Sequence, residues 1–152
     1  MNQRLGILEW SVAACLTVLV VIVFGQVLLR YLTYQPLAWT EEVARYFFVW
    51  LSLLGAAVAA RRGQHFAVDA IQKSLSPRLA KALATAIHII EASFYALLAF
   101  AGLRTALLVH GQSSPTLDLP MSLPYLAIPV GALMMTAIAL RRAWALWVHP
   151  GM

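Results

Sequence analysis

The chain has 152 residues, of which 62% are hydrophobic and only 11% charged, with a formal net charge of +5 and a mean hydropathy of +0.79. A soluble domain usually carries roughly a quarter charged residues, so this composition excludes an ordinary soluble fold and indicates a lipid environment. The cations stand at the ends of apolar runs rather than on one polar face, which argues against a nucleic-acid partner and makes them topology signals.

The first half of the chain predicts two membrane spans. The first span covers residues 7–32, an apolar run longer than the roughly 7 to 15 residues of a signal-peptide core. Pro36 then breaks the chain, and a second span is predicted over residues 41–60. Glu41 and Glu42 fall in its first turn, where carboxylates complement the positive end of a helix.

The second half predicts a short interfacial helix and two more spans. Residues 65–75 are amphipathic but too short to cross a bilayer. The third span, 79–109, would be about 45 Å long as a helix, so it should tilt or project beyond the roughly 30 Å hydrocarbon core. A loop rich in proline and serine precedes the fourth span, 124–141. The predicted fold is a single all-α membrane domain over residues 1–152, with four transmembrane helices and a cytoplasmic interfacial helix.

The distribution of lysine and arginine predicts the orientation of these spans. With the N-terminus in the cytoplasm, eight of the eleven cations lie inside, and only Arg30, Arg45 and Arg104 lie outside. Both termini are therefore expected on the cytoplasmic side.

His88 and Glu91 are the ionisable residues well inside the third span, three positions apart on one helical face. Ionisable groups within a membrane are functional candidates, and a proton-coupled carrier could use such a pair. The alternative is a structural role, with the two side chains hydrogen-bonded to each other or to a neighbouring helix.

Cofactor and metal sites find no support in the sequence. A membrane haem needs two imidazoles at matching depth on different helices, and the four histidines fall at different depths. One carboxylate beside one histidine is too little for a di-iron site, and Cys15 is the only cysteine. We therefore expect no cofactor, no metal and no catalytic constellation, which argues against an enzyme.

Two surfaces of the second span are suited to contacts with other helices or subunits. Its inner half is rich in small residues, with Gly55 and Ala59 at i and i+4, so another helix of this chain or of a partner can approach closely. At its outer start, Trp39 lies beside Glu41, Glu42 and Arg45, with Glu41 and Arg45 in the order that favours an i,i+4 ion pair. Either helix capping or a subunit contact explains this cluster.

The polar residues that follow the second span can likewise be interpreted as structural or as a contact with a partner. Arg62, His65 and Asp69 fall where the chain returns to the cytoplasmic side. They are either a topology anchor with a solvated helix face or a partner contact.

Taken together, these residues resemble a known family. The string R-Y-L-T-Y-Q-P-L-A-W-T-E-E-V-A-R-Y from Arg30 to Tyr46, then Trp50, Gly55-Ala56-Ala57 and R-G-Q-H-F-A-V-D from Arg62 to Asp69, is similar to the small membrane subunit of tripartite ATP-independent periplasmic (TRAP) transporters. About 40 residues carry the resemblance, whereas the later spans agree in number, length and hydropathy.

The resemblance implies a secondary transporter of the bacterial inner membrane. In that family a periplasmic protein captures a substrate, commonly a carboxylate, and delivers it to a two-part permease whose large membrane subunit carries the substrate and sodium sites. The small subunit is a scaffold for the large one. The implied partner-interface candidates here are Trp39, Glu41, Glu42, Arg45, Trp50, Gly55, Ala59, Arg62, His65 and Asp69.

Two other classes of membrane protein compete with this interpretation. A small homodimeric multidrug carrier would use Glu91 for protons, but in that class we would expect the glutamate in the first span, whose stretch from Trp10 to Leu29 has none. A haem- or quinone-binding anchor of a respiratory enzyme would need His88 to find an axial partner at its own depth.

Overall fold

The computed structural model describes residues 6–33, 38–62 and 75–148. Its helices in these ranges are α1 (Ile7–Thr33), α2 (Ala38–Arg62), α4 (Pro77–Leu108), the single turn α5 (Ser122–Tyr125) and α6 (Ala127–Val148). Four segments are long and apolar enough to cross a membrane, which confirms the predicted all-α fold with four spans. The interfacial helix predicted at residues 65–75 falls outside the described residues except for its last position.

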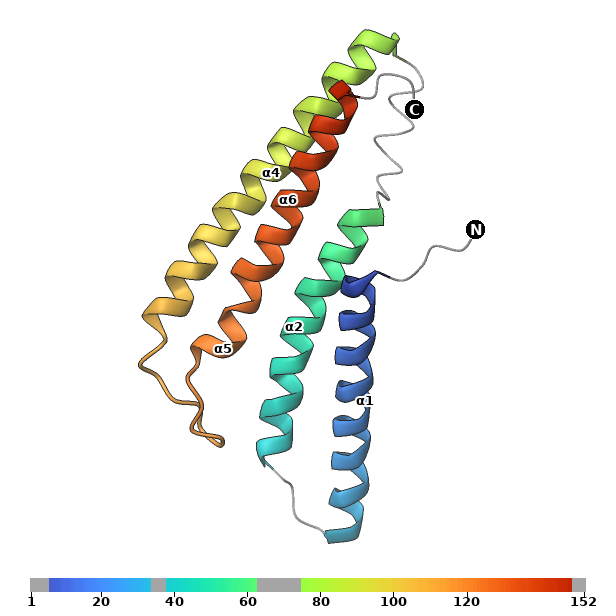
Figure 1. Cartoon of the computed structure of the whole chain (residues 1–152). Helices are drawn as coiled ribbons and strands as arrows, with labels where there is room; N and C mark the ends of the chain where they lie inside the picture. Colours follow the sequence, from blue (N-terminus) through green and yellow to red (C-terminus); the bar gives the residue numbers. More distant parts are fainter. Residues whose placement is uncertain (1–5, 34–37, 63–74, 149–152) are drawn as a thin grey trace.

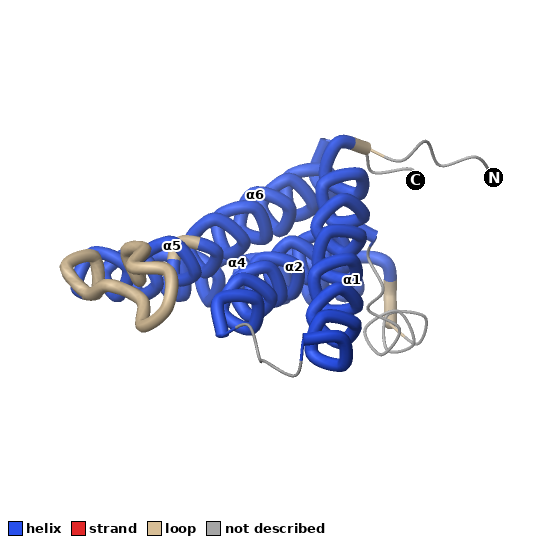
Figure 2. Tube along the Cα trace, turned by 90° about the horizontal axis from the view of Figure 1, so that it is seen from below, coloured by secondary structure: helices blue, strands red, loops and turns tan. Residues whose placement is uncertain are grey.

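The long helices form a row rather than a closed bundle (Figure 1). α6 packs against α4 on one side and against α2 on the other, while α1 packs against α2. Within the described residues, α2 and α4 do not contact each other. The row therefore begins with α1 and ends with α4, and Figure 2 shows α1 far from the loop before α5. The two broad faces of the row are therefore open to lipid or to a partner.

Small residues line the closest helix contacts. In lipid there is little hydrophobic driving force for spans to associate, so van der Waals contacts between closely approaching backbones hold the helices together. The buried face of α4 repeats every seven residues at Ala92, Ala99 and Ala106. At the level of Gly102, a Cβ atom would lie 2.6 Å from Ile128 of α6. A Cβ atom on Gly131 of α6 would likewise lie 2.8 Å from the Cβ of Leu53 on α2.

The ends of α4 and α6 extend beyond the end of α2 (Figure 1). α4 has 32 residues, about 48 Å of helix. α6 continues past Arg141, where the fourth predicted span ends, because no helix breaker occurs before Pro150. The Lys81 ammonium lies 4.3 Å from the centroid of the Trp147 ring, which joins the two projecting ends.

Candidate partner-binding site

Glu42, near the start of α2, is the centre of a polar cluster at the end of the molecule that carries the loop between α4 and α5. Its side chain is buried, with 7% of the residue exposed. The Tyr46 hydroxyl donates to Oε1 at 2.5 Å, the Thr116 N–H donates to Oε2 at 3.1 Å, and Ser114 adds a side-chain hydrogen bond. Hydrogen bonds to a carboxylate are stronger than those between neutral groups, so this cluster fastens α2 to the loop between α4 and α5.

The loop between α4 and α5 is held in shape by its own hydrogen bonds. The Ser114 N–H donates to the Leu119 carbonyl at 2.8 Å, and the Leu119 N–H donates back to Ser114 Oγ at 3.2 Å. Ser113 and Pro120 form an isolated antiparallel bridge, and Asp118 adopts a φ of 54°, which aspartate tolerates better than most residues. This tight turn presents its hydroxyl and amide groups to the carboxylate on α2.

Trp50 adds a second connection, between α2 and α5. Its Nε1–H donates to the Leu123 carbonyl of α5 at 3.2 Å. His110 Nδ1 lies 3.1 Å from Ser122 Oγ, so the end of α4 is also tied to α5. The polar edge of Trp50 is therefore used within this chain.

Arg45 lies on the rim of a hollow of about 430 Å³ beside this cluster. Its side chain is exposed and forms no ion pair or hydrogen bond with another described residue. The i,i+4 ion pair with Glu41 is therefore not formed, and Glu41 instead lies 3.5 Å from the Gln26 amide of α1. The hollow is otherwise mainly apolar, lined by Glu42, Tyr46, Val49, Pro115, Met121, Pro124, Tyr125 and Ile128.

At the opposite end of the molecule, charged side chains connect α1, α2 and α6. Arg61 forms an ion pair with Glu9 of α1 at 3.3 Å. Arg142 of α6 donates from Nη2 to the Arg61 carbonyl at 3.0 Å, which satisfies one of the free carbonyls at the C-terminal end of α2. These contacts fix the lateral order of the three helices at one level.

His88 and Glu91 form the pair that their spacing indicates, with Nδ1 and Oε2 3.0 Å apart and side chains 16% and 20% exposed. α4 runs antiparallel to α6, with Gly102 beside Ile128 and Lys81 beside Trp147. The same register places Glu91 beside the turn of α6 that precedes Arg142. The pair therefore lies toward the same end of the molecule as Arg61 and Arg142.

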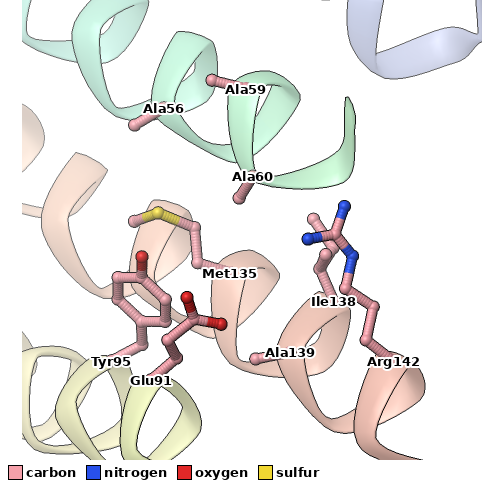
Figure 3. Close-up of a pocket in the computed structure, with 9 residues that line it drawn as sticks. All are labelled: Ala56, Ala59, Ala60, Glu91, Tyr95, Met135, Ile138, Ala139 and Arg142. Atoms are coloured by element: carbon pink, nitrogen blue, oxygen red, sulfur yellow. The ribbon is translucent and has the colours of Figure 1, made fainter. Parts of the chain in front are cut away.

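A second hollow, of about 320 Å³, lies between α2 and α4 with α6 as its floor. Figure 3 shows Glu91 and Tyr95 extending from α4 and Arg142 from α6 into the space below the small residues of α2. The Tyr95 hydroxyl makes no hydrogen bond with another described residue. Nowhere in residues 6–33, 38–62 and 75–148 do three His, Cys, Asp or Glu side chains gather as metal ligands would.

The partner-interface candidates taken from the sequence separate into several environments. Trp39 is 47% exposed and Glu41 and Ala59 are exposed, whereas Glu42 is buried. A Cβ atom on Gly55 would meet nothing within 4 Å, so none of the described helices approaches closely there. The Arg62 side chain, His65 and Asp69 lie outside the part that the structure describes.

Five further residues belong to these two sites although the sequence did not single them out. Tyr46 stands four positions after Glu42, so helical spacing alone could have indicated that contact. Ser114, Thr116, Tyr95 and Arg142 gave no such signal, because the loop or the neighbouring helix brings each of them to its site.

Comparison with known proteins places the chain in a family. The family described as tripartite ATP-independent periplasmic transporters, DctQ component, matches residues 19–149. A putative TRAP transporter small permease protein of Haemophilus influenzae is 30% identical over 144 residues, which cover 93% of this chain and 86% of that protein. The C4-dicarboxylate TRAP transporter small permease protein DctQ of Rhodobacter capsulatus is 35% identical over 101 residues, covering 65% of this chain and 44% of that protein.

A much longer relative is also similar. The isethionate TRAP transporter permease protein DctMQ of Oleidesulfovibrio alaskensis is 32% identical over 150 residues, which cover 86% of this chain but only 23% of that protein. The chain thus spans about a quarter of the length of this relative. With four membrane-spanning helices and a family match over residues 19–149, the chain is a multi-pass membrane protein that belongs to the DctQ component family of TRAP transporters.

Proposed function

We propose that the chain is the non-catalytic small permease subunit of a sodium-coupled TRAP transporter, and that it scaffolds a separate large membrane subunit. The family match over residues 19–149 carries this proposal. The open row of helices supports it, because both broad faces of the row are accessible and polar groups occupy the two ends of the molecule. Spans that pack through small residues in a row of this kind are suited to serve as a wall for another membrane domain.

The names of the relatives support a large subunit as partner and an organic acid as substrate. One relative carries the joined name DctMQ and is far longer than this chain. The relatives are named for isethionate, C4-dicarboxylates and, in the SiaT protein of Haemophilus influenzae, sialic acid, all of which are organic acids. Sodium coupling and delivery by a periplasmic binding protein follow from the family resemblance.

The charges favour an orientation in the bacterial inner membrane with both termini in the cytoplasm. Lys81, Arg61 and Arg142 gather at one end of the molecule together with Trp144 and Trp147, as at a cytoplasmic interface. The opposite end presents Trp39, Glu41 and Arg45 on the side from which a periplasmic binding protein would approach.

Co-purification tests the proposed partner. This chain, tagged and co-expressed with a TRAP large subunit from the same organism, should retain that subunit through mild detergent extraction and size exclusion. Deleting the chain should abolish uptake of the substrate. A stable monomer that leaves the large subunit behind, together with unchanged uptake in the deletion strain, would contradict the proposal.

A further inference from the structure

The two hollows lie beside the same side of α2 and are both lined by α6, whereas α4 lines only the inner one. The outer hollow includes Arg45 and Val49 of α2, and the inner hollow includes Ala56 and Ala59 of the same helix. The exposed Ser52 lies between these two sets. Consecutive members of the series are four, three, four and three positions apart, so all of them lie on one side of α2: Arg45, Val49, Ser52, Ala56 and Ala59. Because α2 and α4 do not meet and α6 lies between them, we call the two hollows and this side of α2 the α2–α4 groove.

Each end of the groove presents a polar group that pairs with no other described residue. At the outer end, the Arg45 guanidinium forms no ion pair with another described residue. At the inner end, the Tyr95 hydroxyl makes no hydrogen bond within the described part of the chain, and it stands beside the Glu91 carboxylate in the inner hollow. The Tyr95 hydroxyl lies among the helices, where an unpaired polar group is costly. Arg45 lies near the outer interface, where its charge can attract an acidic side chain of a partner.

The shape of the groove fits a helix better than a lipid. From Arg45 to Ala59 it extends over about 21 Å of helix, most of the hydrocarbon thickness of a bilayer. Ala56, Ala59 and Ala60 keep its inner half shallow, which lets the backbone of another helix approach closely. Acyl chains offer no acceptor to Arg45 and no hydrogen bond to Tyr95.

We infer that the α2–α4 groove receives one membrane-spanning helix of the large subunit. That helix carries a carboxylate opposite Arg45 at the outer end and a polar side chain opposite the Tyr95 hydroxyl at the inner end. This inference rests on the proposed function and extends it, because it states where the large subunit binds and which side chains it must present.

Photo-crosslinking in the assembled complex tests the occupant directly. The crosslinker p-benzoylphenylalanine is placed at Ala59 in the groove, or at Ala96, which is exposed on α4 but lines neither hollow. Irradiation should join the large subunit to the chain from position 59 and not from position 96. Adducts of phospholipid mass alone from position 59 would overturn the inference.

Two substitutions test the groove by loss of binding, each with a matched control. Ala59→Trp fills the inner hollow and Arg45→Glu reverses the outer charge, whereas Ala96→Trp and Arg104→Glu make the same changes at exposed positions of α4 outside the groove. We expect the first pair to lower the amount of co-purified large subunit by at least about tenfold and the controls to leave it unchanged.

The outcomes separate the inference from the function on which it rests. If the wild-type chain retains the large subunit and Ala59→Trp and Arg45→Glu retain it equally, the groove is not the binding site, although the small-subunit function stands. If the wild-type chain itself retains no large subunit, the proposed function fails and the inference fails with it.

Discussion

Substituting valine for Gly131 is expected to destabilise the isolated chain by about 1–3 kcal/mol, the usual cost of overpacking a tight contact. A Cβ atom at this position would lie 2.8 Å from the Cβ of Leu53 and 3.3 Å from its carbonyl oxygen. The contact involves the backbone of α2, so a change of side-chain rotamer cannot relieve it. α2 and α6 must therefore separate, and the connection between the two halves of the row weakens.

Gly55→Val is the matched control for Gly131→Val. Both glycines lie within long helices, so the change in helix propensity is similar, but a Cβ atom on Gly55 meets nothing within 4 Å. Unfolding of the purified chain in mixed micelles, followed by circular dichroism as the fraction of SDS rises, compares the two variants. Equal midpoints would show that α2 and α6 do not pack closely at this glycine.

Replacing Glu42 with alanine is expected to release the outer loop and to reduce uptake strongly while membrane insertion stays normal. The substitution removes the acceptor that Tyr46, Ser114 and the Thr116 amide share. Donors left without a partner in a buried site favour an opened loop in which water can reach them. Hydrogen exchange at the Thr116 amide should accelerate, and protease should cut between α4 and α5.

Glu41→Ala provides the comparison for Glu42→Ala. Glu41 is the neighbouring carboxylate in the same helical turn, but it is exposed and its amide contact with Gln26 is long, at 3.5 Å. We expect exchange at Thr116 to stay slow in this variant. Similar loop protection in the Glu41 and Glu42 variants would reduce the role of Glu42 to that of a charge at the start of a helix.

The number and type of the helices follow from the sequence because a span must satisfy its own backbone hydrogen bonds in lipid. Long apolar runs separated by Pro36, by the polar stretch 63–76 and by the proline-rich segment before Pro124 therefore indicate four helices. Alanines seven residues apart on α4, such as Ala92 and Ala99, also indicate which face of this helix is buried. By contrast, the sequence gives little indication of which spans pack against each other, because a helix that is apolar on all sides has no distinct face for a neighbour.

The candidate site was less predictable than the fold because its contacts join distant parts of the chain. Glu42 meets the Thr116 amide across 74 positions, and Arg142 meets the Arg61 carbonyl across 81. One partner in each of these hydrogen bonds is a backbone group, which every residue carries, so residue type gives no clue to the pairing. By contrast, helical spacing indicates the contacts within one helix, His88 with Glu91 three positions apart and Glu42 with Tyr46 four positions apart.

The measurement that tests this account most directly is reconstituted transport. The purified large subunit is placed in liposomes with or without this chain. The binding protein is added outside with its radiolabelled organic acid, and an inward sodium gradient is imposed. We expect substrate to accumulate only in liposomes that contain both membrane subunits, and accumulation to stop when the sodium gradient is removed. Accumulation at the same rate by the large subunit alone would contradict the claim that this chain is a required part of the permease.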